Sequence, residues 1–251
     1  MNKLSGQNKA LELAQAKKII HNTALYWNRG TRAGIQGSLR RVRWILSAVD
    51  MVPGKKVLEV GCGMGFYTEI FAKSGAQVHG IDLSPDFIEK AVERLRNLAE
   101  LKTCDIEDLP YPDNCFDAIV GIRVLHHLDM ESAFKEILRT LKPGGAIAFC
   151  EPNMLNPQLM IQKNIPWIKK RMGDTPDETA FFKQRLGRFL QRQGFKDIAI
   201  EPFDFLHPWT PAPLTNAVDK LGRLLEQTPI IREIAGSLKI RAVNNNMEDN
   251  K

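Results

Sequence analysis

The pattern of apolar and polar positions predicts alternating strands and helices through the middle of the chain. Residues 57–60 form a short apolar run, as expected for a parallel strand that is buried on both faces. Three glycines follow at alternate positions, and residues 66–75 then predict a helix that ends at a glycine. Further apolar runs, separated by helical patterns, predict a mainly parallel α/β sheet; they lie at 78–82, 116–121 and 146–150.

The glycine turn after the first strand indicates a nucleotide site. Gly61, Gly63 and Gly65 let the backbone turn tightly and approach a ligand, while the next helix begins with unpaired N–H groups. The spacing differs from the dinucleotide-binding pattern, because Phe66 stands where that pattern has its third glycine. The second strand ends in Asp82, about 20 residues after the turn, where an acid can accept both hydroxyls of a ribose.

These residues resemble the class I S-adenosylmethionine-dependent methyltransferases, in the branch of the ubiquinone- and menaquinone-biosynthesis methyltransferases. The resemblance extends from about residue 55 to residue 153 and includes the segments 116–120, 124–128 and 141–149. It implies a Rossmann-like sheet of seven strands in the order 3-2-1-4-5-7-6, with the seventh strand antiparallel. It also implies S-adenosylmethionine as the cofactor and S-adenosylhomocysteine as the product.

The resemblance further implies roles for individual positions. The three glycines would face the methionine portion of the cofactor, Asp82 would hold the ribose hydroxyls, and Asp105 would hold the adenine amino group. Arg123 lies where this family lines the methionine end, which suggests a contact with the cofactor's carboxylate. The expected cofactor-binding residues are therefore Glu59, Gly61, Gly63, Gly65, Asp82, Leu83, Asp105, Ile106 and Arg123.

A catalytic base is not identifiable from the sequence. The candidates are His127, Glu151 and His207, each at a predicted strand end or in a segment that covers the site. A phenol, thiol or stabilised carbanion needs little help from a base, so catalysis mainly by alignment in a water-poor site is the expectation. The neighbouring His126 and His127 cannot chelate one ion with the usual helical spacing, and one of them is expected to brace the loop. No metal site is predicted.

Residues outside the sheet are expected to cover it. Two helical patterns, at residues 4–22 and 37–51, predict an N-terminal helical cap over residues 1–51, in which Tyr26 and Trp27 would touch the cofactor, the substrate or the sheet edge. The methyltransferase domain would span 52–244, followed by a polar, disordered tail at 245–251. Within the domain, Ser84 is expected to cap a helix that has Pro85 in its first turn and extends to about residue 98, and a further helix is predicted at 178–193.

Two insertions, at about 154–177 and 207–236, follow the fifth and sixth strands, whose ends lie on the cofactor side. We refer to these insertions as the lid segments. Their apolar residues alternate with basic ones such as Lys163 and Lys169, which suits a small apolar or amphiphilic acceptor methylated at O, C or N. Alternatively, the apolar residues only hold the lid segments onto the sheet.

The net charge of +6 is unevenly distributed, because residues 1–50 are strongly basic and residues 51–150 are acidic. A basic segment suits nucleic acid, an anionic lipid surface or an acidic substrate, and it also fits a solvated helix. Base-modifying methyltransferases usually carry an N/D-P-P-Y/F motif after the fourth strand, where this chain has residues 121–124. A nucleic-acid (RNA) methyltransferase is thus the less favoured alternative within enzymes, and a non-catalytic cofactor-binding scaffold is the alternative outside them.

The sequence also bounds the cellular setting. No run of 18 apolar residues is present, so no membrane span is expected, although peripheral membrane contact stays open. The N-terminus lacks the apolar core of a signal peptide. The cysteines, at positions 62, 104, 115 and 150, have neither C-x-x-C nor zinc-ligand spacing. Free thiols in a reducing, cytoplasmic setting are therefore expected.

Overall fold

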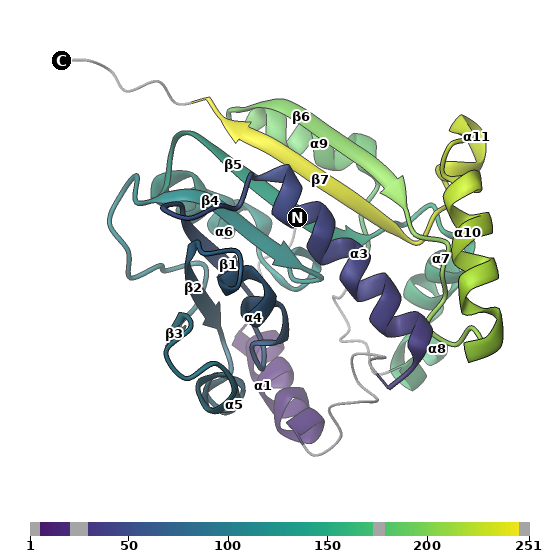
Figure 1. Cartoon of the computed structure of the whole chain (residues 1–251), viewed down its shortest axis with the longest axis horizontal. Coiled ribbons are helices and arrows are strands. Elements are labelled where there is room, and N and C mark those ends of the chain that lie inside the picture. Colours follow the sequence, from purple (N-terminus) through teal and green to yellow (C-terminus); the bar gives the residue numbers. More distant parts are fainter. Residues whose placement is uncertain (1–5, 21–29, 173–178, 246–251) are drawn as a thin grey trace.

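Seven strands form one mixed sheet in the computed structural model, which describes residues 6–20, 30–172 and 179–245 (Figure 1). Their order is β3-β2-β1-β4-β5-β7-β6. Strand β7 runs antiparallel to β5 and β6, and the other neighbours are parallel. This topology confirms the expected order and the antiparallel seventh strand. The strands are β1 Lys56–Val60, β2 Gln77–Asp82, β3 Glu100–Thr103, β4 Phe116–Ile122, β5 Leu141–Pro152, β6 Phe195–Phe203 and β7 Ser237–Asn244.

Helices cover both faces of the sheet, because successive strand side chains point to opposite sides. On one face, Ile119 and Ile147 pack against α6 (Met130–Thr140) and α9 (Lys183–Arg192). On the other face, Ala118 and Ala148 belong to a cluster with residues of α3 (Arg32–Ala48) and α4 (Phe66–Ala72). Helix α5 (Pro85–Leu95) packs on β2 and β3. The sheet is therefore buried on both sides, and its edge at the carboxyl ends of the strands is left for ligands.

Local chemistry explains where several elements begin. Ser84 caps α5 by accepting a hydrogen bond from the Phe87 N–H at 3.3 Å, and Pro85 occupies the first turn, as the sequence predicted. The helix predicted from residue 37 begins instead at Arg32, because the Thr31 side chain accepts from the Gly34 N–H and caps an earlier turn. Tyr26, Trp27 and the predicted tail after residue 245 lie outside the described residues.

The helix predicted at 178–193 begins later than expected, at Lys183. The preceding residues are extended because Phe181 forms a bridge with Asn153. The Phe181 N–H donates to the Pro152 carbonyl at 3.0 Å, and the Met154 N–H donates to the Phe181 carbonyl at 2.9 Å. This pairing keeps the first lid segment close to the end of β5.

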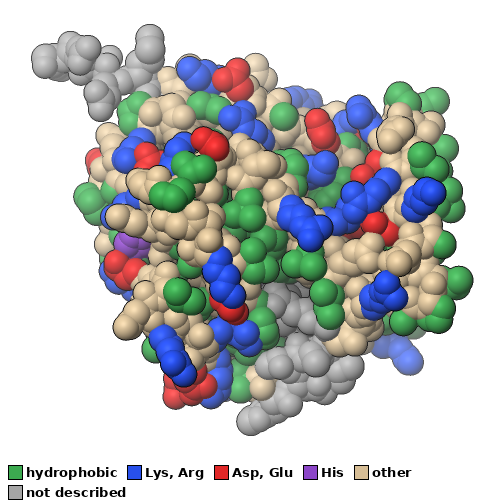
Figure 2. Space-filling view, in the orientation of Figure 1, with side chains coloured by type: hydrophobic (Ala, Val, Ile, Leu, Met, Phe, Trp, Pro, Cys, Tyr) green, Lys and Arg blue, Asp and Glu red, His purple; other side chains and the backbone are tan. Residues whose placement is uncertain are grey.

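The lid segments contain short helices on one side of the molecule (Figure 1). The first contains α7 (Pro157–Asn164) and α8 (Pro166–Met172), and the second contains η2 (Ala212–Leu214), α10 (Thr215–Leu225) and α11 (Pro229–Arg232). Figure 2 shows green apolar side chains along the right-hand edge, over α10 and α11. Since Ile230 is 86% exposed and Trp167 is 68% exposed, these side chains do not hold the lid segments onto the sheet.

Ion pairs join α3 to Asp204, just after β6, and to the second lid segment. The Arg41 guanidinium donates to the Asp204 carboxylate, and both side chains are buried. Arg40 donates to the Glu226 carboxylate at 2.8 Å and lies 3.4 Å from the Asp219 carboxylate. Because a buried charge is costly unless it is paired, this network fixes α10 against α3.

Within the described ranges, no helix is long and apolar enough to cross a bilayer. All four cysteines are free, which confirms the expected thiols, and Cys62 and Cys150 are buried. Burial raises the pKa of the Cys104 thiol to about 11 and that of Cys62 well above its usual value. These thiols are therefore protonated near neutral pH.

Candidate active site

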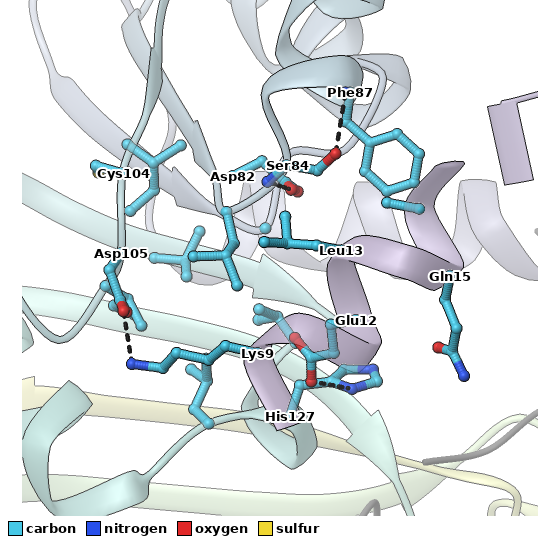
Figure 3. Close-up of a pocket in the computed structure, with 18 of the residues that line it drawn as sticks. Lys9, Glu12, Leu13, Gln15, Asp82, Ser84, Phe87, Cys104, Asp105 and His127 are labelled. Atoms are coloured by element: carbon cyan, nitrogen blue, oxygen red, sulfur yellow. Dashed lines mark hydrogen bonds and ion pairs between the residues drawn. The ribbon is translucent and has the colours of Figure 1, made fainter. Parts of the chain in front are cut away.

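A cavity of about 140 Å³ lies at the carboxyl ends of β1, β2 and β4, beneath helix α1 (Gly6–Ile20) (Figure 3). It brings together residues that the sequence analysis took from separate motifs. The predicted residues that line it are Gly61, Asp82, Leu83, Asp105, Ile106, Arg123 and His127. Gly63, Gly65, Glu59, Glu151 and His207 do not line it.

The glycine turn has the backbone that only glycine adopts easily. Gly61 and Gly65 have φ values of 68° and 76°, in the left-handed region. A Cβ on Gly61 would lie 2.6 Å from Val124 Cγ2, and one on Gly65 would lie 2.8 Å from Leu95 Cδ1. The turn thus needs glycine both for its backbone conformation and for its packing against the loop after β4.

Asp82 ends β2 and holds the glycine turn in place. Its Oδ2 accepts from the Gly63 N–H and its Oδ1 from the Ser84 N–H, both at 2.9 Å. Burial raises the pKa of the Asp82 carboxyl, and its two backbone hydrogen bonds partly oppose that shift. A carboxylate has about four lone-pair positions, so Asp82 can still accept two hydroxyl groups from a ligand in the cavity.

Asp105 follows β3 on the next side of the cavity. Its Oδ1 accepts from the Glu107 N–H at 3.0 Å, which orients the carboxylate. The side chain of Ile106 beside it is buried and faces the cavity. A hydrogen-bond acceptor next to an apolar surface suits an aromatic ring that carries an amino group, because the amino group can donate to the carboxylate while the ring contacts the apolar side chain.

Helix α1, which lies in the segment expected to form an N-terminal helical cap, provides the remaining wall, but its polar side chains were not among the predicted site residues. Lys9 Nζ lies 2.6 Å from Asp105 Oδ2 and 2.8 Å from Glu107 Oε2, and Glu12 Oε1 lies 3.1 Å from His127 Nδ1 (Figure 3). Burial lowers the pKa of Lys9, but the hydrogen bonds to the two carboxylates outweigh it and raise the pKa. The helical pattern could predict α1, but no local signal shows which surface its polar side chains face.

Glu151 braces the loop after β4 from behind the cavity. Its Oε1 accepts from the Val124 and Leu125 N–H groups at 2.8 and 2.9 Å, and its Oε2 lies 2.6 Å from His126 Nδ1. Of the two adjacent histidines, His126 thus contacts Glu151, and His127 lines the cavity. Burial raises the pKa of Glu151 to about 7, although the two backbone hydrogen bonds lower it.

The raised pKa of Glu151 predicts a stability that depends on pH. From its ordinary value of 4.5 up to about 7, the folded state holds a proton that the unfolded state has lost, so stability falls as pH rises through this window. Replacing Glu151 by glutamine removes that titration. We expect E151Q to gain about 2 kcal/mol relative to wild type between pH 5 and pH 8, measured by urea unfolding. E201Q, at an exposed position, is the control for the same substitution; a pH-independent difference for E151Q would contradict this account.

Arg123 is an unusual residue at the rim of the cavity. Its backbone has a φ of 57° and its N–H donates to the Cys150 carbonyl at 2.8 Å. Nearby protein atoms and the neighbouring charge of Arg41 lower the pKa of its guanidinium, although the residue is exposed to solvent. In the described part of the chain, no carboxylate lies within 4 Å of this guanidinium, whereas Arg41 is paired with Asp204. A cation in this setting favours an anionic ligand.

His207 lies in the second lid segment with both ring nitrogens in contact with neighbours. Its Nδ1 accepts from the Trp209 N–H at 3.2 Å, and its Nε2 lies 2.9 Å from the Gln158 amide. Burial and the charge of Arg123 lower the pKa of this imidazole.

Among the described residues, no group of His, Cys, Asp or Glu side chains is arranged to hold a metal ion.

Comparisons with known proteins agree with this geometry. Residues 58–149 match the family model of a methyltransferase domain. Phosphoethanolamine N-methyltransferase 3 of Arabidopsis thaliana is 33% identical over 174 residues, which cover 66% of this chain and 34% of the relative. The chain belongs to the class I S-adenosylmethionine-dependent methyltransferases.

Two further proteins are similar to this chain, one in sequence and one in fold. The demethylmenaquinone methyltransferase of Thermobifida fusca is 29% identical over 163 residues, which cover 59% of this chain and 68% of the relative. The solved structure of phosphoethanolamine N-methyltransferase 2 of Haemonchus contortus, in complex with S-adenosylmethionine, has a TM-score of 0.60 at 19% identity. Its alignment covers 82% of this chain and 52% of the other. The chain spans about a third of the length of the phosphoethanolamine methyltransferases that it matches in sequence.

The residues that line the cavity fit the chemical groups of the methyltransferase cofactor. Carboxylates face the cavity at Asp82 and Asp105, beside the apolar Ile106 and the cationic Arg123, which matches the ribose, the adenine ring and the carboxylate of the cofactor. Helix α1 lies along one side of this space, where its polar side chains face Asp105 and His127.

Proposed function

We propose that the chain transfers the methyl group of S-adenosylmethionine to a small acceptor that is apolar or amphiphilic, at O, C or N. The observation that carries this proposal is the meeting of Gly61, Asp82 and Asp105 around one cavity at the carboxyl ends of the strands. These residues come from three separate motifs, and open α/β sheets bind their ligands at this edge.

The cofactor would be held by residues of four segments. The Asp82 carboxylate would accept the ribose hydroxyls, Asp105 would accept from the adenine amino group, and Leu83 and Ile106 would contact the ring. The turn at Gly61, Gly63 and Gly65 would lie along the methionine portion, with Glu59 at the strand end beneath it. When bound, S-adenosylmethionine supplies an electrophilic methyl group whose leaving group is a neutral thioether.

The acceptor would be activated mainly by alignment and by exclusion of water. Glu151 accepts two backbone hydrogen bonds behind the cavity and contacts His126 Nδ1, and both ring nitrogens of His207 contact neighbours. Among the three candidate bases, His127 is the one whose side chain lines the cavity. We therefore propose His127 as the residue nearest the reaction and Glu151 as a residue that positions its loop.

The acceptor class is supported by the relatives and by the lid segments. The relatives' names give phosphoethanolamine and demethylmenaquinone as their substrates, and both are small molecules. The exposed Trp167 and Trp209 of the lid segments would suit an apolar part of the acceptor or a membrane surface that holds it. The four free thiols support a cytoplasmic setting.

The proposed role of Arg123 can be tested with two ligands. We expect R123M to weaken the binding of S-adenosylhomocysteine about tenfold, because a charge-assisted contact with its carboxylate is lost. Methylthioadenosine lacks the amino-acid portion, so its affinity is expected to be unchanged. R43M, on the exposed side of α3, is the matched control. Equal affinity of R123M and wild type for S-adenosylhomocysteine would instead assign Arg123 to the acceptor.

Methyl transfer itself is best tested with cofactor labelled in the methyl group. The acceptor panel would contain a hydroquinone with an apolar chain, phosphoethanolamine and a structured RNA. Label transferred to a small acceptor, and not to RNA, is the result expected from the proposal. Transfer to RNA alone would favour the nucleic-acid alternative, and bound cofactor without transfer to any acceptor would favour the scaffold.

A further inference from the structure

Helix α1 lies across the cofactor cavity and is held there by its own charged residues. Lys9 reaches the Asp105 and Glu107 carboxylates, at 2.6 and 2.8 Å, and Glu12 reaches His127 at 3.1 Å (Figure 3). Both Lys9 and Glu12 line the cavity. They lie outside the matched segment 58–149, so the family match assigns them no role.

The two halves of α1 are attached in different ways. Toward its C-terminal end, Ala16 and Ile19 are buried in an apolar cluster with Met64 and Phe87. Toward its N-terminal end, the attachment is made by the ion pairs of Lys9 and Glu12, whose side chains are 27% and 23% exposed. Partly exposed ion pairs contribute little stability and exchange readily. The N-terminal half can therefore move while the apolar cluster keeps the helix attached.

The Lys9 ammonium occupies the position where the adenine amino group is proposed to bind. Both groups are hydrogen-bond donors, and both are directed at the Asp105 carboxylate. The ammonium lies 2.6 Å from Asp105 Oδ2, so the cofactor and Lys9 compete for one carboxylate oxygen, and the N-terminal half of the helix moves when the cofactor takes that position.

We propose that α1 is a gate over the cavity. Lys9 closes this gate by pairing with Asp105 and Glu107, and the cofactor opens it by replacing Lys9. This inference rests on the proposed function, because it takes Asp105 as the acceptor for adenine. The apparent affinity for the cofactor is then reduced by the fraction of molecules in which the gate is closed. Weakening the gate raises the affinity although no contact to the cofactor is added.

The test is a calorimetric titration of S-adenosylhomocysteine and S-adenosylmethionine into K9M, E107Q and wild type. K9M removes the cation and E107Q removes one of its two partners while Asp105 stays intact. We expect K9M to bind both ligands about threefold more tightly than wild type and E107Q to show a smaller gain. K17M, which alters an exposed lysine of the same helix, is expected to match wild type.

The two ligands separate gating from direct electrostatics. S-adenosylmethionine carries a sulfonium charge that S-adenosylhomocysteine lacks, so a gain for both supports the gate. A gain confined to S-adenosylmethionine, or weaker binding by K9M, would overturn it, because Lys9 would then act on the ligand itself. If wild type binds and K9M shows no gain over K17M, the gate alone is wrong. If none of the four proteins binds either ligand, the proposed function fails and the gate fails with it.

Discussion

Replacing Asp82 by asparagine is expected to weaken the binding of S-adenosylmethionine about 100-fold. The carboxylate is proposed to accept two hydroxyls of the ribose, and each hydrogen bond to a charged group contributes about 1.5 to 3 kcal/mol. Asparagine has one acceptor oxygen, and its amide N–H₂ would face one of the two backbone N–H groups that Asp82 now accepts from. The variant therefore loses contacts to the ligand and part of the support of the glycine turn.

The Asp82 result needs a control for folding and for the substitution. D86N makes the same change in the first turn of α5, outside the cavity, and is expected to bind like wild type. Affinities come from calorimetric titration, and melting curves establish that each variant is folded. Binding by D82N within about threefold of wild type would contradict the placement of the ribose at Asp82.

Gly61→Ala is expected to lower the stability of the fold by about 3 kcal/mol. The left-handed backbone at φ 68° costs a residue with a side chain about 1 to 2 kcal/mol. The added Cβ would also lie 2.6 Å from Val124 Cγ2, and such overpacking typically costs about 1 to 3 kcal/mol. For a protein of this size, the melting temperature is expected to fall by about 6 to 12 °C.

Gly144→Ala is the matched control for Gly61. Gly144 also has a left-handed backbone, with a φ of 73°, but a Cβ there would meet no atom within 4 Å. Its replacement is therefore expected to cost about 1 kcal/mol from the backbone alone. Melting curves of the two variants isolate the collision with Val124. Equal losses in the two variants would contradict a role for tight packing between the glycine turn and the loop after β4.

The sheet was predictable because its signals are local. The apolar run at 57–60, the glycines after it and the acid at Asp82 are each visible within a few residues, and the resemblance supplied the strand order. The start of α5, with Ser84 as the cap and Pro85 in the first turn, was likewise predictable from neighbouring residues. Local signals of this kind report backbone conformation and burial, so they place strands and turns well.

The polar contacts of α1 were not predictable, because they join residues far apart in the chain. Lys9 and Asp105 are 96 residues apart, and nothing near Lys9 indicates its partner. The same holds for Glu151. A glutamate at this position could be a catalytic base, but its side chain lies behind the loop after β4, where it accepts hydrogen bonds from the loop backbone and contacts His126. The roles of Lys9 and Glu151 depend on which distant residues pack beside them, and the sequence of one segment does not show its partners in the fold.

The most direct test of the central claim is a crystal structure of the chain with S-adenosylhomocysteine. The account predicts the ribose hydroxyls on the Asp82 carboxylate, the adenine amino group on Asp105, and Lys9 displaced from that carboxylate. A ligand bound elsewhere on the sheet, or an adenine ring away from Asp105 with the Lys9 pair intact, would contradict it.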